Sequence, residues 1–219
     1  MSATYGWVNL LSSFGFTWWW RRQCIRFAKL PHGARVGDFM SGQGETWHQI
    51  HKAIGAHGQI VGFDFSSGMV TLSAQNPMTR RGKVHISQQN ALHTALANDS
   101  LDAVVAGFGL KTLSEHQMRS LAQEVRRVLK PGGTFSLVEI STPASKLLLW
   151  PYMFYLRYCI PIIGKLCLGN PDNYRFLAQY TQLFQNARRA QSAFQAAGLH
   201  TDYAELFFGC ASAIYGYKE

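Results

Sequence analysis

The chain has 219 residues, of which 47% are hydrophobic and 15% charged, so it is long and apolar enough for one folded domain and does not have the composition of a disordered protein. Its formal net charge is +9, but the basic residues lie in short scattered groups without interleaved aromatics, which argues against a nucleic-acid partner. Attraction to an anionic membrane stays open as an alternative to a solvated basic surface.

Between residues 35 and 140, short apolar runs that predict strands alternate with amphipathic patterns that predict helices. Strands are predicted at 35–40, 59–64, 83–87, 101–107 and 134–140. Helices are predicted at 45–54, at 66–76, and from a capping box at Ser114 and Gln117 to the KPGG sequence at 130–133. This alternation predicts a parallel sheet with helices on both faces.

After Pro143 the pattern changes to two aromatic-rich helical stretches, at 147–168 and 174–184. The first approaches the length of a membrane span, but prolines and basic residues interrupt it, so we expect helices over a lipophilic pocket or on a membrane surface. A helix at 191–197 and two alternating strands at 200–209 and 210–218 complete the chain. These last strands predict an antiparallel hairpin at one edge of the sheet.

The expected fold is therefore α/β: a doubly wound, seven-stranded, mostly parallel sheet with a C-terminal antiparallel hairpin and a helical lid. One domain is expected over residues 1–219. Within it we expect an N-terminal helical lid at 1–30, a cofactor-binding core at 31–143, a helical insertion over an acceptor pocket at 144–190, and the terminal helix and hairpin at 191–219.

Three candidate ligand-binding loops follow the first three predicted strands, where the carboxyl ends of parallel strands bind ligands. Asp38 precedes a glycine-bearing turn at 41–44, Asp64 ends the second strand, and Asn90 follows the third. Glycines let a backbone approach a ligand, a carboxylate can accept ribose hydroxyls, and an amide can pair with an adenine edge. Alone, each feature is also typical of a tight turn, a helix cap or an Asx turn; their order, followed by KPGG, favours a nucleoside site.

These residues resemble a class I methyltransferase with a Rossmann-like sheet. The opening segment YGWVNLLSSFGFTWWWRR, the stretch FGLKTLSEHQ followed by EVRRVLKPGG, and the block WPYMFYLRYCIPIIGKLCLGNPDNYRFL resemble the ubiquinone/menaquinone-biosynthesis methyltransferases over nearly the whole chain. The resemblance implies S-adenosyl-L-methionine as cofactor, S-adenosyl-L-homocysteine as product, and a hydrophobic, often quinol-like acceptor.

Carried over residue by residue, the resemblance implies cofactor contacts from Asp38, Gly42, Gln43, Gly44, Asp64, Phe65, Met69, Asn90, Ala91 and Phe108. Aromatic residues of the two lid segments are expected to line the acceptor pocket: Trp19, Trp20, Tyr152 and Tyr155.

The candidate catalytic residues are Tyr5, Lys111 and Thr112, and two of these positions depart from the family pattern. The opening Tyr-Asp of the family is Tyr5-Gly6 here, and its Arg-Asn pair after FG(I/L) is Lys111-Thr112. In carbon-methylating members that pair is thought to help deprotonate the quinol. Lys111 could act as a base if burial made it neutral, or it could steady a phenolate or phosphate as a cation. Asn90 stands where the family usually has an Asp that faces adenine.

The sequence predicts methyl transfer to a small lipophilic quinol, phenol or related aromatic, at carbon or oxygen. Two alternatives stay open: N-methylation of a phospholipid headgroup, and a non-catalytic S-adenosylmethionine-binding protein. No metal site is expected, because the cysteines lack a CxxC pair and His48 and His51 lack an acidic third ligand. Reduced cysteines and no secretory signal predict a cytoplasmic protein, with a peripheral location at the inner membrane and a homodimer left open.

Overall fold

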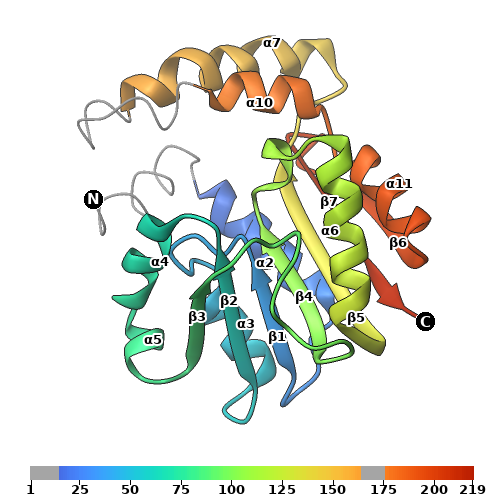
Figure 1. Cartoon of the computed structure of the whole chain (residues 1–219). Helices are drawn as coiled ribbons and strands as arrows, with labels where there is room; N and C mark the ends of the chain where they lie inside the picture. Colours follow the sequence, from blue (N-terminus) through green and yellow to red (C-terminus); the bar gives the residue numbers. More distant parts are fainter. Residues whose placement is uncertain (1–14, 164–175) are drawn as a thin grey trace.

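The computed structural model describes residues 15–163 and 176–219, which form a seven-stranded sheet in the order β3-β2-β1-β4-β5-β7-β6 (Figure 1). The strands are β1 (Arg35–Phe39), β2 (Gln59–Asp64), β3 (Val84–Gln88), β4 (Leu101–Gly107), β5 (Leu129–Ile140), β6 (Leu199–Leu206) and β7 (Ala211–Lys218). The first five pair in parallel, and β7 pairs antiparallel with both β5 and β6. The predicted fold, including the C-terminal hairpin, is confirmed.

Helices cover both faces of this sheet. On one face lie α2 (Phe16–Ala28) and α3 (Trp47–Ile54), and on the other lie α6 (Glu115–Val128) and α11 (Arg188–Ala196). The short helices α4 (Ser67–Ala74) and α5 (Pro77–Arg80) contact the edge strand β3. Strand β1 lies between β2 and β4 and is buried on both sides, as is usual for an interior strand of a parallel sheet.

Local sequence signals account for several helix ends. The capping box is present, because the Ser114 hydroxyl accepts the Gln117 backbone N–H and the Gln117 side chain accepts the Ser114 N–H. Gly55 follows α3 with a positive φ of 75°, which favours glycine. Helix α11 begins three residues before the predicted position, because the Asn186 side chain accepts the Arg188 N–H and starts the helix there.

The described part of the predicted N-terminal lid is a layer of the core. Helix α2 packs on β4, β5 and β7. The Thr134 hydroxyl donates to the carbonyl of Ala28, and the buried thiol of Cys24 donates to the carbonyl of Ser136 at 3.2 Å. These contacts tie α2 to the sheet along its length. Residues 1–14 of the predicted lid lie outside the described residues.

A second helical segment lies above the carboxyl ends of the strands (Figure 1). It comprises α7 (Lys146–Phe154), the π-helical turn η2 (Tyr155–Cys159) and α10 (Leu177–Phe184), which pack together through Leu156, Ile160 and Ala178. Pro151 lies inside α7 and lacks an N–H donor, and the π-turn follows four residues later. Helical structure is confirmed at 147–163 and 177–184, and no helix in the described residues is long and apolar enough to cross a membrane.

Candidate active site

The loops after β1, β2 and β3 meet at the carboxyl edge of the sheet. The backbone N–H of Ser41 donates to the carbonyl of Phe63 at 2.9 Å, and that of Gly42 donates to the Asp64 carboxylate at 2.9 Å. The N–H of Gln89 donates to the Asp64 carbonyl at 3.1 Å. Asp64, at the end of β2, therefore joins the loops that follow β1 and β3.

The turn after β1 has a backbone that requires glycine. Gly42 and Gly44 have φ angles of 57° and 82°, and a Cβ built on Gly44 would lie 2.2 Å from the indole ring of Trp47. The Glu45 carboxylate accepts the N–H of Gln43 at 3.2 Å and lies 3.7 Å from the Arg21 guanidinium. A glycine-containing turn that is bordered by carboxylates is suited to a ligand that carries positive charge.

Asp38 is a buried carboxyl group at the base of this turn. One of its oxygens accepts the hydroxyl of Thr46 at 2.6 Å, and the other has no hydrogen-bond partner in the described part of the chain. Burial, reinforced by the charge of Glu45, raises the pKa of Asp38 to about 7, although the Thr46 hydrogen bond lowers it. A ligand with a donor or a positive charge would complete this group.

Asp64 and Asn90 each use part of their hydrogen-bonding capacity to hold a loop. The Asp64 carboxylate accepts the N–H groups of Gly42 and Ser66, which leaves lone pairs for a ribose. The side-chain oxygen of Asn90 accepts the N–H of Leu92 in an Asx turn. The side-chain amide hydrogens of Asn90 are then the groups that it could offer to a ligand. Of their neighbours, Phe65 is 75% exposed and Ala91 is buried.

A second cluster joins the ends of β4 and β5. Glu139 is fully buried, and its carboxylate accepts four donors: the backbone N–H groups of Gly109, Lys111 and Ile140 and the Lys111 ammonium at 2.9 Å. The hydroxyl of Thr112 donates to the Gly109 carbonyl and closes the same turn. The ion pair between Lys111 and Glu139 therefore joins the turn after β4 to the end of β5.

Phe108 lies between the two clusters. Its φ is +78°, and its N–H donates to the carbonyl of Val138. The Arg21 guanidinium lies 4.8 Å from its ring centroid, and the Lys111 nitrogen lies 5.9 Å from it. Helix α2, strand β4 and strand β5 therefore converge on one aromatic ring at the carboxyl edge.

The aromatics predicted to line the acceptor pocket lie in different environments. Trp19 is 37% exposed, whereas Trp20 is buried in the core beside the sheet. The Tyr152 hydroxyl donates to the carbonyl of Cys210 at 3.0 Å, and Tyr155 is partly buried where α7 meets α10. Trp20 and Tyr152 thus serve the packing of the core, and Tyr5 lies outside the described residues.

Comparison with known proteins assigns the chain to a family. The model of the ubiE/COQ5 methyltransferase family matches residues 1–218. The chain belongs to this family. It is 30% identical to the demethylmenaquinone methyltransferase of Lactiplantibacillus plantarum, over 100% of this chain and 93% of that protein. It is 28% identical to the demethylmenaquinone methyltransferase of Staphylococcus haemolyticus, over 100% of this chain and 91% of that protein. A crystal structure of a SAM-dependent methyltransferase from Aquifex aeolicus has a TM-score of 0.62 at 16% identity, over 90% of this chain and 88% of that one.

The ubiE/COQ5 protein is thus an S-adenosylmethionine-dependent methyltransferase, which confirms the resemblance read from its motifs. The residues at the carboxyl edge fit this cofactor. The unpartnered oxygen of Asp38 and the carboxylates of Glu45 and Asp64 suit a ligand with a sulfonium, an ammonium group and ribose hydroxyls.

Three charged residues that the sequence did not indicate also lie at the carboxyl edge: Arg21, Glu45 and Glu139. The rule that located Asp38 and Asp64, an acidic residue at the carboxyl end of a parallel strand, also applies to Glu139 at the end of β5. Glu45 directly follows the glycine turn and was open to the same argument. Arg21 is different, because only the packing of α2 on the sheet brings it to this edge.

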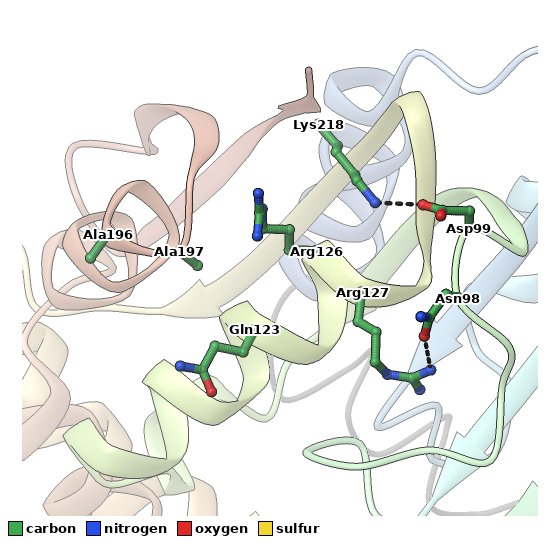
Figure 2. A pocket seen from close by; sticks show the side chains of 8 residues that line it. All are labelled: Asn98, Asp99, Gln123, Arg126, Arg127, Ala196, Ala197 and Lys218. Atoms are coloured by element: carbon green, nitrogen blue, oxygen red, sulfur yellow. Dashed lines mark hydrogen bonds and ion pairs between the residues drawn. The ribbon is translucent and has the colours of Figure 1, made fainter.

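A cavity of about 480 Å³ lies at the opposite edge of the methyltransferase's sheet, between α6, α11 and the end of β7 (Figure 2). Two of its cations are already paired: Lys218 with Asp99 at 2.5 Å, and Arg127 with Glu124 at 2.7 Å. This cavity adjoins the start of β4, so it is remote from the carboxyl edge where the cofactor loops meet.

Proposed function

We propose that the protein methylates a quinol- or phenol-like lipophilic aromatic with S-adenosylmethionine. The observation that carries this proposal is the full-length similarity to demethylmenaquinone methyltransferases, at 28–30% identity over 100% of the chain. The apolar helical segment above the carboxyl edge supports it, because a lipophilic acceptor needs an apolar surface beside the methyl donor.

The proposal gives the cofactor loops separate roles. The backbone of Gly42, Gln43 and Gly44 would lie against the methionine part, and Asp64 would accept the ribose hydroxyls. Asn90 and Ala91 would border the adenine. The neighbouring Asp38, Phe65, Met69 and Phe108 complete the expected contact set. S-adenosylmethionine supplies an electrophilic methyl group, so the protein has to align the acceptor and exclude water.

Lys111 would act as a fixed cation beside the acceptor. Its ammonium is held in an ion pair by the buried carboxylate of Glu139 at 2.9 Å, which fixes its position at the end of β5. A cation placed there stabilises a phenolate or quinolate, the nucleophilic form of the acceptor. Thr112 would shape the turn through its bond to Gly109, and Trp19 and Tyr155 would border the acceptor.

The decisive experiment is incubation of the purified protein with deuteromethyl-labelled S-adenosylmethionine and a reduced short-chain demethylmenaquinol. We expect mass spectrometry to find one labelled methyl on the quinol ring. A parallel incubation with phosphatidylethanolamine vesicles tests the headgroup alternative. Label in the lipid headgroup and none in the quinol would contradict the proposal.

The proposal also places the enzyme in peripheral contact with the cytoplasmic face of the inner membrane, where such an acceptor would dissolve. Sedimentation equilibrium of the purified protein tests whether it forms a homodimer.

A further inference from the structure

A stripe of exposed apolar side chains runs along α7 and the helical residues that follow it. Leu147, Trp150, Phe154, Tyr158 and Ile162 have exposed fractions of 91%, 78%, 59%, 51% and 58%. Their spacings of three, four, four and four residues place them on one face of a helix. Large apolar groups in such a row mark a surface that meets an apolar partner.

The opposite face of the same helix is anchored to the protein. Leu148 and Tyr152 pack against the core beside the sheet, and Leu156 and Ile160 pack against α10. The Tyr152 hydroxyl adds a hydrogen bond to the β6–β7 turn. The stripe, which we call the α7 stripe, is therefore presented outward by a helix whose other side is fixed.

Charge near the α7 stripe has one sign. Residues 140–171 contain no Asp or Glu, whereas the exposed Lys146 and Arg157 flank the stripe, in a chain with a net charge of +9. An apolar face with basic flanks matches a bilayer with anionic headgroups. A second copy of this chain would bring the same cations together, which disfavours a symmetric pairing of two stripes.

We propose that the α7 stripe lies in the headgroup region of an anionic lipid bilayer and holds the carboxyl edge of the sheet against the membrane. This inference rests on the proposed function, because a lipophilic acceptor is dissolved in that bilayer. Figure 1 shows α7 and α10 above the strand ends that carry the cofactor loops. Docking there lets the acceptor reach the methyl donor with little exposure to water.

Vesicle co-sedimentation tests the docking. We expect the wild-type protein to bind vesicles that contain phosphatidylglycerol, to bind phosphatidylcholine vesicles less, and to weaken with salt. The double variant Trp150→Ser/Phe154→Ser should lower the partition coefficient at least tenfold, since it removes two large apolar groups. Tyr217→Ser, which removes a 41% exposed aromatic at the opposite edge of the sheet, should leave it unchanged.

A second readout distinguishes insertion from attraction by charge alone. We expect brominated lipids to quench tryptophan fluorescence in the wild-type protein. Trp150→Phe should bind vesicles equally well and lose most of that quenching. Lys146→Gln/Arg157→Gln should lower binding to anionic vesicles about thirtyfold and remove most of its salt dependence, because each of the two cations near the surface contributes about 1 kcal/mol.

Two outcomes would overturn the inference. One is equal vesicle binding by the wild-type protein and Trp150→Ser/Phe154→Ser, or no binding by either. The other is a wild-type dimer that this double variant abolishes, which would assign the α7 stripe to a second copy. Turnover of a water-soluble quinol without vesicle binding would contradict the membrane docking but not the proposed function. Vesicle binding without turnover of any acceptor would contradict the proposed function.

Discussion

Asp38 is fully buried, and one of its carboxyl oxygens has no hydrogen-bond partner in the described residues. Folding therefore changes the pKa of this group, and the stability of the protein depends on pH. The pKa of Asp38 is about 7 in the folded chain against an ordinary 3.8, so between these pH values the folded protein holds a proton that the unfolded chain has lost. The free energy of unfolding should therefore fall as pH rises from about 4 to about 7, by up to about 1.4 kcal/mol per unit, and level off above.

Asp38→Asn should remove this contribution, since an amide does not titrate. Urea unfolding at pH 5, 6, 7 and 8 measures it as the difference between the variant and the wild-type protein. The exposed Asp202→Asn serves as the control and should keep the wild-type slope. A variant at position 38 with the wild-type slope would mean that another group titrates in this range.

Asp64 supports both the turn after β1 and, in our proposal, the ribose. Asp64→Ala should weaken S-adenosylmethionine binding by about 1–3 kcal/mol, the usual cost of leaving hydrogen-bonding groups without a partner. Titration calorimetry measures this change, and Asp202→Ala, an exposed acid on β6, is the matched control. Unchanged affinity would show that the ribose lies elsewhere.

Two substitutions of Lys111 distinguish a role as a fixed cation from a role as a general base. Lys111→Ala should lower kcat at least tenfold, whereas Lys111→Arg should retain most of the activity, since a guanidinium stays charged and cannot act as a base. Calorimetry with S-adenosylmethionine should give wild-type affinity for both. Inactivity of both variants would indicate a neutral, proton-accepting lysine, and wild-type turnover of Lys111→Ala would remove it from the mechanism.

At the scale of elements, the start of α6 is set by a local signal. Its capping box satisfies two backbone N–H groups, so Ser114→Ala should lower the free energy of unfolding by about 1 kcal/mol. Ser120→Ala, further along the same helix, removes only a hydroxyl bond to the His116 carbonyl and should change it by less than about 0.5 kcal/mol. Urea unfolding compares them, and equal effects would show that the cap contributes nothing specific.

Side-chain hydrogen bonds shifted the starts of two other helices. The helix predicted from residue 45 begins at Trp47, and the Thr46 hydroxyl is bound to Asp38 while the Glu45 carboxylate closes over the glycine turn. Helix α11 begins at Arg188, whose N–H donates to the side chain of Asn186, a bond that the apolar period did not indicate. Helical periodicity indicates which face of a helix is buried. The residue at which the helix begins depends on side-chain hydrogen bonds, which periodicity does not show.

At the scale of the whole molecule, the cofactor should stabilise the native state, because its proposed site joins loops from separate strands. Binding at a ligand concentration of one hundred times Kd adds about 2.7 kcal/mol, which for a chain of this size raises Tm by about 5–10 °C. Thermal unfolding followed by circular dichroism with and without S-adenosylmethionine measures the shift. Free methionine is the control ligand, and an unchanged Tm would argue against a site built from these loops.

The amino-acid sequence was enough to predict the order of strands and helices, the parallel core with its terminal hairpin, and the candidate carboxylates at the ends of the first two strands. These follow from periodicity, caps and the rule that parallel strands end at one edge. Only the folded chain shows that Arg21 reaches this edge, that Glu139 forms an ion pair with Lys111, and that Trp20 belongs to the core. The Cys24–Ser136 hydrogen bond, which helps to place α2 and Arg21, joins residues 112 positions apart, and the packing of α2 on the sheet brings them within bonding distance.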